Sequence, residues 1–126
     1  MKLEFYIFFV FLVFFGVRVL DNIRNNADKD FVINTIVRGC ARWASASLQD
    51  KSPLVAVLHA NYAAGYLWAL RDVFSDKDIQ RSANVDIIKF QKRITDVQDK
   101  ATKLMVSVCP KYRTDIDEYL GRIGGE

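Results

Sequence analysis

The 126-residue chain contains little of what metal sites and catalytic sites are usually built from. It has one histidine and two cysteines, whereas a structural zinc site takes four His, Cys or carboxylate ligands. Its six glycines are scattered and form no phosphate-binding loop. Two prolines are too few for a collagen-like or low-complexity chain. We therefore expect no metal site, no cofactor and no catalytic residues, in a chain long enough for one compact domain.

A strong excess of charge is also missing. The chain has 18 Lys and Arg against 15 Asp and Glu, which gives a formal net charge of +3. Basic and acidic residues alternate, so no basic stripe of the kind that binds nucleic-acid phosphates is visible. We expect no nucleic-acid partner, and the flat charge profile favours a protein or membrane partner.

Apolar residues are instead concentrated at the N-terminus. Thirteen positions from Phe5 to Val17 carry no charge. As an α-helix, residues 3–20 would reach roughly 27 Å, close to the hydrocarbon thickness of about 30 Å. We predict that residues 1–20 form a single transmembrane anchor in a lipid bilayer. The residues expected to carry this anchor are Phe5, Phe8, Phe9, Phe11, Leu12, Phe14, Phe15 and Arg18.

Three alternatives to an anchor stay open. A cleaved signal peptide has a similar length, but Glu4 is out of place in one, and the first alanine is as late as Ala27, so no A-x-A cleavage site follows. A buried strand would be shorter than thirteen residues. A core helix that is apolar all round would need protein on every side.

The flanking charges indicate the orientation of the anchor. Arg18, Arg24 and Lys29 follow the apolar segment, against Lys2 and the α-amino group before it. The positive-inside rule then places the bulk of the chain on the cytoplasmic side.

The rest of the chain predicts a small antiparallel helical bundle of three to four helices, in an all-α fold. Residues 21–30 are polar and rich in Asn and Asp, so we expect either the frayed end of the first helix or a polar hinge. Asp30 would then be the N-cap of a new helix over 31–49. The bundle domain would comprise residues 31–126.

The boundary of the next helix is the clearest in the sequence. Ser52 suits an N-cap and Pro53 the first helical position, which predicts a helix over 53–74. Two patterns run along this helix. One is an apolar stripe and the other a ridge of small residues that favours close helix crossings. The stripe contains Leu54, Leu58, Tyr62, Gly65, Ala69 and Val73, and the ridge contains Ala56, Ala60 and Ala64.

A heptad pattern follows a polar stretch in which Ser75 and Asp78 have capping-box spacing. Apolar residues recur every three or four positions from Ile87 to Val108, which predicts a helix. The heptads favour either one helix of the bundle or a homo-oligomeric coiled coil. Pro110 ends this helix, and we expect a short final helix over 114–122.

Two candidate chemistries are weak. His59 has no visible nucleophile partner, so a packed histidine is favoured over an enzyme that pairs it with Asp72 or another carboxylate. Cys40 and Cys109 are consistent with a disulfide or with two free thiols.

Aromatic residues are the best candidates for recognition of a protein partner, because they dominate both cores and interface hot spots. On a helix, Tyr62 and Tyr66 share a face that Trp68 does not, so one face must look outward or meet another subunit. The candidate partner interface is Trp43, Tyr62, Tyr66 and Trp68.

The segments ARWAS, QDKSPL and LHANYAAGYLWALRDV, within residues 41–73, support a resemblance to a family. They resemble small membrane-associated virion proteins, minor capsid proteins of nucleocytoplasmic large DNA viruses of algae and protists. The resemblance covers about a quarter of the chain. It implies an inserted N-terminal helix in the virion inner membrane and a helical body under the capsid, with capsid proteins as partners. It implies no catalytic residues.

These observations predict a non-enzymatic, membrane-anchored structural protein that links a lipid membrane to a larger protein assembly, and the resemblance implies that it is a minor capsid protein of a large DNA virus. The alternative is a single-pass membrane adaptor that recruits a soluble partner outside any virion.

Overall fold

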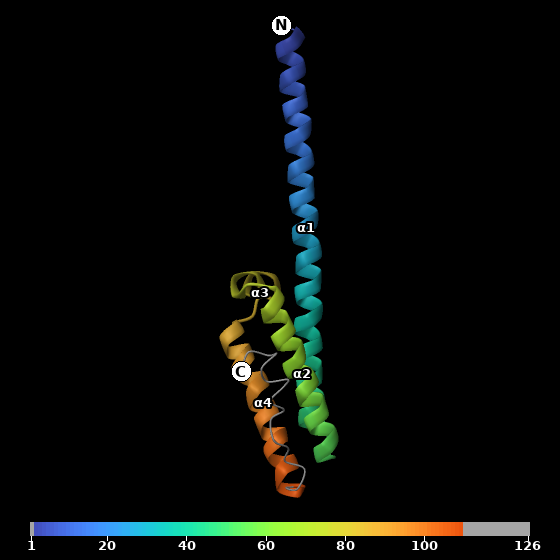
Figure 1. The fold of residues 1–126 in the computed structure, drawn as a ribbon, viewed down its shortest axis with the longest axis vertical. Helices are drawn as coiled ribbons and strands as arrows, with labels where there is room; N and C mark the ends of the chain where they lie inside the picture. The colour runs from blue at the N-terminus through green and yellow to red at the C-terminus, as the bar shows by residue number, and fades with distance from the viewer. Residues whose placement is uncertain (1, 110–126) are drawn as a thin grey trace, which may run out of the picture.

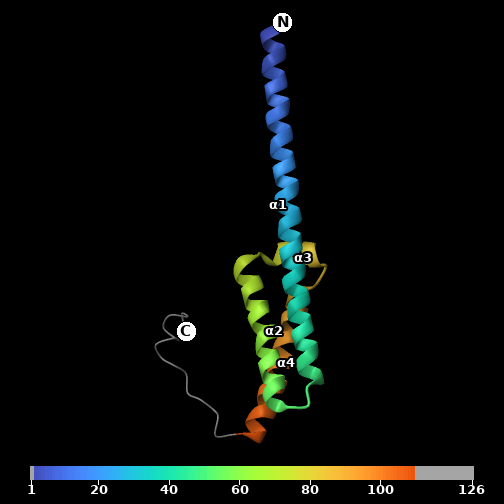
Figure 2. The same cartoon turned by 90° about the vertical axis from the view of Figure 1, so that its right-hand side faces the viewer.

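The computed structural model describes residues 2–109, and within them the chain is entirely α-helical, without strands. The predicted all-α class is confirmed. The four helices are α1 (Lys2–Gln49), α2 (Pro53–Val73), α3 (Asp76–Ala83) and α4 (Ile87–Val108). The first half of α1 projects far beyond the other helices, and α2 and α4 lie alongside its second half (Figures 1 and 2). We call residues 31–108 the helical body. The short helix expected over 114–122 lies outside the described residues.

The polar segment 21–30 is not a hinge, which corrects the sequence-based expectation. Residues 21–30 are helical throughout, and Asp30 lies inside α1 instead of capping a new helix. The helix has no proline, and its two glycines, Gly16 and Gly39, lie outside this segment, so nothing in 21–30 stops helix propagation. The side chains of Lys29 and Asp30 bond to α3, so tertiary contacts satisfy the polar groups that suggested a turn.

The caps predicted for α2 and α3 are confirmed. Ser52 is the N-cap of α2 and accepts a hydrogen bond from the Val55 backbone N–H, with Pro53 in the first turn. Ser75 is the N-cap of α3 and accepts from the Asp78 backbone N–H at 3.2 Å. The helix α3 ends at Asn84, whose φ of 52° is left-handed, a conformation that asparagine tolerates. The polar residues 76–83 thus form a helix of their own.

Small residues bring α1 and α2 together. The alanine ridge of α2 is buried, with Ala60 fully enclosed, and its position allows the two backbones to approach closely. The hydroxyl of Ser47 on α1 donates to the carbonyl of Ala56 at 2.7 Å, which satisfies a buried polar group at this crossing. Larger residues complete the core, namely Ile33, Leu67, Leu70, Ile79, Ile87 and Ile94.

The heptad stripe of α4 is used mainly inside the chain. Ile87, Ile94, Val97 and Ala101 are buried in the helical body. Leu104 and Val108, at the end of the stripe, are exposed. A coiled-coil contact with another copy along the whole stripe would therefore have to compete with the core for the same side chains.

Candidate membrane and interaction surfaces

Residues 3–20 of α1 are mainly apolar and have no protein neighbours among the described residues. We call this segment the rod. Every side chain described from Leu3 to Phe15 is exposed, and Phe11 is 75% exposed. The helix is long and apolar enough to cross a membrane by length and composition, and its most apolar window is not buried at all. All the predicted anchor residues lie on this rod, including Arg18, whose guanidinium lies 5.4 Å from the centroid of the Phe14 ring.

The junction between the rod and the helical body is polar. The ammonium of Lys29 lies 2.6 Å from a carboxylate oxygen of Asp78 on α3. Asp30 accepts from the Ser82 hydroxyl and pairs with Arg81 at 3.4 Å. Hydrogen bonds from Lys29 and then from Ser75 lower the pKa of Asp78, so this carboxylate stays charged at neutral pH. These side-chain contacts attach α3 to α1 at the end of the body nearest the rod (Figure 1).

The predicted aromatic residues do not all meet in one site. Trp43 is half-buried and lies 5.3 Å from Tyr62 and 4.9 Å from His59, measured between ring centroids. Tyr66 packs beside Gly39 of α1, where an added Cβ would lie 3.5 Å from its ring. Trp68 is 47% exposed and makes none of the ring contacts of this cluster. The set therefore splits into a cluster between α1 and α2 and a separate exposed tryptophan.

The carboxylate that pairs with His59 is Asp50. The enzyme alternative had paired His59 with Asp72 or another carboxylate. The Nδ1 atom of His59 lies 2.6 Å from a carboxylate oxygen of Asp50, on the turn between α1 and α2. Both groups are largely buried, with 24% and 21% of their side chains exposed. The imidazole also lies against the Trp43 ring, with the two ring planes tilted by 37°. This arrangement closes the α1–α2 turn by a charge-assisted hydrogen bond and an aromatic contact.

Both cysteines are free thiols. Cys40 is fully buried and donates to the carbonyl of Ala63 at 3.1 Å, in the middle of the α1–α2 crossing. Burial raises the pKa of Cys40 to about 12, so its thiol is neutral and unreactive in the folded protein. Cys109 lies at the end of α4 and is only half-buried.

The apolar stripe of α2 faces outward, which the sequence pattern alone did not reveal. The alanine ridge is buried, whereas the other side of the helix is exposed, and Tyr62 lies at the edge of that exposed side, where its ring also contacts Trp43 of α1. We define the α2 outer face as Leu54, Leu58, Tyr62, Gly65, Trp68 and Ala69. The signal was present in the sequence, since both sides of this helix are apolar, but only packing decides which side is buried.

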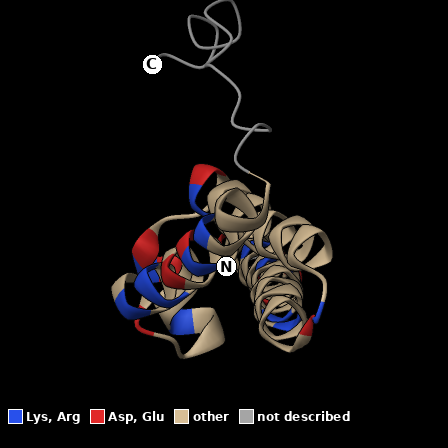
Figure 3. Cartoon of the chain, turned by 90° about the horizontal axis from the view of Figure 1, so that it is seen from below, with Lys and Arg blue, Asp and Glu red and all other residues tan. Residues whose placement is uncertain are grey.

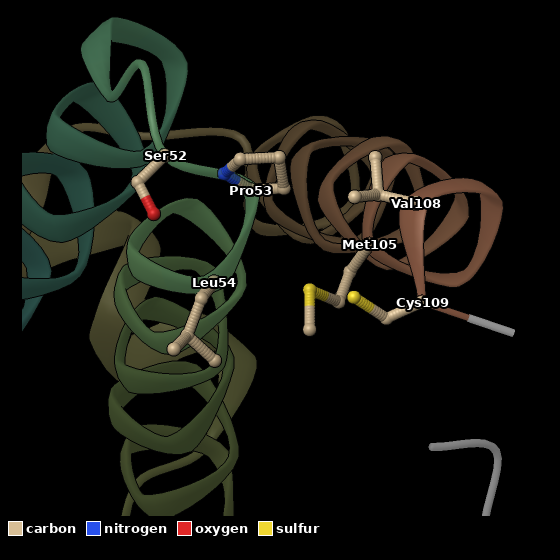
Figure 4. A pocket seen from close by; sticks show the side chains of 6 residues that line it. All are labelled: Ser52, Pro53, Leu54, Met105, Val108 and Cys109. Atoms are coloured by element: carbon tan, nitrogen blue, oxygen red, sulfur yellow. The ribbon is translucent and has the colours of Figure 1, made fainter. Parts of the chain in front are cut away.

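A hollow lies at the lower end of this face. Its volume is about 540 Å³, and its walls come from the start of α2 and the end of α4. Figure 4 shows Leu54 on one side of the hollow and the sulfur atoms of Met105 and Cys109 on the other. The lining is almost wholly apolar, and Leu54 makes the hollow continuous with the α2 outer face.

Comparisons with protein-family models, curated proteins and solved structures find no match to this chain. The features of the molecule that bear on its function are the exposed rod, the polar junction and the α2 outer face.

Proposed function

We propose that this chain is a non-enzymatic, single-pass membrane protein that holds its helical body beside a bilayer and links that bilayer to a larger protein assembly. The observation that carries the proposal is the exposure of the apolar rod. Leaving about a dozen large apolar side chains in water would be costly, since each Leu or Phe gains about 1.5–3 kcal/mol on burial. A lipid hydrocarbon layer removes this cost along the whole rod.

The dimensions of α1 fit this placement. Residues 3–20 cover roughly 27 Å of hydrocarbon, and residues 21–30 add about 15 Å of polar helix. A head-group layer is roughly 5–8 Å thick, so the polar segment passes through it and brings α3 close to the membrane surface. The basic residues Arg18, Arg24 and Lys29 support a cytoplasmic position for the body.

The uninterrupted helix α1 supports a linking role. Because one helix runs from the rod into the helical body, the body would keep a fixed direction relative to the membrane. Confinement to a surface raises the effective concentration of the body for its neighbours, so individually weak contacts are sufficient for assembly.

The kind of assembly is proposed from the resemblance of residues 41–73 to minor capsid proteins. A capsid under which the body sits would use the exposed surfaces of α2 and α4 as contacts. Proteomics of purified virus particles tests this form of the proposal. Stoichiometric recovery supports a virion component, and absence from particles leaves the membrane adaptor that recruits one soluble partner.

Membrane insertion is tested by alkaline carbonate extraction of full-length protein expressed in cells. The protein should stay in the membrane fraction until detergent is added. The Leu12→Arg variant, with a charge at the middle of the rod, should be extracted more readily, because an arginine there costs about 2.5–3.5 kcal/mol on insertion scales. Phe31→Arg replaces an exposed apolar residue of α1 beyond the rod and should behave as the parent. Release of the parent protein by carbonate alone would contradict the proposal.

A further inference from the structure

The α2 outer face has the composition of an interface rather than of an ordinary surface helix. From Pro53 to Leu70 the helix contains no Asp, Glu, Lys or Arg, and its only imidazole, His59, turns toward α1. Leu58 is 45% and Tyr62 is 51% exposed. A helix that is apolar on both sides is normally buried on both sides. Viewed along the long axis, charged positions lie on α3, on α4 and also on α1 and the turn that follows it, whereas α2 is nearly free of them (Figure 3).

The size of this face suits a pairwise protein contact. A Tyr or Trp side chain offers about 150–250 Å², and roughly half of each aromatic residue on the face is exposed. Together with the half-exposed leucines and the hollow below them, the apolar surface of the face is on the order of several hundred Å². This is somewhat below the ~800 Å² that each partner contributes to a standard interface, and confinement to a membrane lowers the area required.

The direction of α2 decides what can cover the face. The axis of α2 lies alongside that of α1, and the helix runs from the far end of the body back toward the rod (Figure 2). Its outer face therefore stands upright and cannot lie flat on the bilayer. A second copy in the same membrane has the same upright orientation, and so the two α2 helices would meet side by side with identical residues opposed.

An uncharged face suits such a symmetric contact. In a two-fold interface each residue near the axis meets its own copy, so any charge there would meet a like charge. The outward side of α4 is charged, with Lys89 and Lys92 paired to Asp86 and Asp96, so charged side chains there would have to be desolvated in a contact between copies, whereas the α2 outer face carries no charge. Gly65 has no neighbour within 4 Å of an added Cβ, and with Ala69 it leaves room for a close helix approach between flanking aromatic rings.

We infer that the α2 outer face is the contact through which two copies of this chain, anchored in the same membrane, form a dimer. The inference rests on the proposed function, because the shared anchor direction is what makes the two faces parallel. With interaxial distances of about 8–10 Å, the two rods would be on the order of 25 Å apart, since α1 packs on the far side of α2 from the dimer axis. The dimer thus forms in the body and not between the membrane helices.

The experiment uses full-length protein in phosphatidylcholine vesicles, in a Cys109→Ser background so that the half-buried thiol does not react. Single cysteines are introduced by Gly65→Cys and Leu58→Cys on the face, by Lys103→Cys on α4 and by Phe11→Cys on the rod. Mild oxidation should give intermolecular disulfides at positions 58 and 65 and little at positions 103 and 11. Adding Leu58→Arg to Gly65→Cys should reduce crosslinking by more than about tenfold, because like charges then meet across the axis. The control is Ile88→Arg, which introduces the same charge at an exposed apolar residue of α4 and should not reduce the crosslinking.

Each other outcome overturns the inference. Equal crosslinking at position 103 or 11 would mean random collision or pairing of the rods. Absence of crosslinks together with labelling of Gly65→Cys by a water-soluble maleimide would mean an uncovered face. Absence of crosslinks together with protection from the maleimide would mean that residues 110–126 or another protein cover it. Flotation of the same vesicles after carbonate treatment reports on the anchor separately, so loss of insertion is distinguished from loss of dimerisation.

Discussion

At the scale of single residues, the crossing of α1 and α2 depends on small side chains that pack closely. Cys40 donates its thiol hydrogen to Ala63, Ser47 donates to Ala56, and Ala60 is fully enclosed. Each of these groups is small and satisfied, which is why the two helix backbones can lie close together. The sequence shows the small residues and their spacing, but it does not show that the thiol and the hydroxyl bond across the crossing.

The thiol of Cys40 should make stability depend on alkaline pH. Its pKa rises from 9.0 to about 12 on folding, so the folded protein keeps a proton that the unfolded chain loses above pH 9. The stabilising contribution is therefore complete below pH 9 and is lost as the pH rises toward 12. From this group alone, the free energy of unfolding should fall by up to about 1.4 kcal/mol per pH unit in that range.

Chemical denaturation in detergent at several values between pH 8 and 11 measures this slope. Cys40→Ala is the control, because it removes the titrating group and leaves the lysines and tyrosines in place. The wild type should lose stability more steeply than the variant above pH 9. Equal slopes would contradict a buried, neutral thiol, as would rapid labelling of Cys40 in folded protein.

Enlarging the alanine ridge tests the close crossing directly. Ala60→Leu inserts three carbons where Ala60 is fully enclosed, and overpacking of this kind costs about 1–3 kcal/mol. Ala41→Leu adds the same atoms on an exposed side of α1 and should change stability by less than about 0.5 kcal/mol. Thermal or chemical denaturation monitored by circular dichroism measures both. An Ala60→Leu variant as stable as the parent would mean that the crossing is looser than described.

At the scale of helices, local sequence signals predicted where a helix begins better than they predicted whether a helix continues. Ser52 with Pro53, and Ser75 with Asp78, mark real helix starts because a cap is chemistry within four residues. Residues 21–30 look like a turn locally, yet contacts of Lys29 and Asp30 with α3, about fifty residues away, keep them helical. The outward orientation of Leu54, Leu58 and Tyr62 was likewise unpredictable, because two apolar sides compete for one core and the smaller residues win by allowing closer packing.

Breaking α1 in its polar segment should uncouple the body from the rod. Ala27→Pro removes a backbone hydrogen bond and costs about 3 kcal/mol in a helix interior, so the helix should kink or separate there. Spin labels are attached at Phe15→Cys and Lys103→Cys in a Cys109→Ser background. Double electron–electron resonance then measures the distribution of distances between the rod and the body. The parent should give a narrow distance distribution and Ala27→Pro a broad one.

The control for this experiment is Asn26→Ala, which changes a neighbouring polar residue without breaking the helix. It should keep the narrow distribution of the parent, because alanine favours helix more than asparagine does. A broad distribution in the parent itself would restore the hinge and remove the fixed orientation on which the linking role depends.

At the scale of the whole molecule, the chain is a rod with a body attached to one half. The rod has no protein partner among the described residues, the junction is polar, and the body keeps one uncharged face open. These three features have one common explanation in a bilayer. In the proposed arrangement, lipid would cover the rod, the head groups would meet the polar junction, and the α2 outer face would meet a neighbour held in the same membrane.

The most direct test of this account is a depth profile of α1 in a bilayer. Single nitroxide labels are placed at successive positions from Leu3 to Asp30 of the full-length protein in vesicles, and their accessibility to oxygen and to a water-soluble nickel complex is measured. The account predicts an oxygen maximum near Val10 to Leu12, a crossover close to Leu20, and high nickel accessibility from Asp21 onward. Uniform access of the nickel complex along residues 5–15, or protection that repeats every 3.6 residues as on a helix packed against protein, would contradict it.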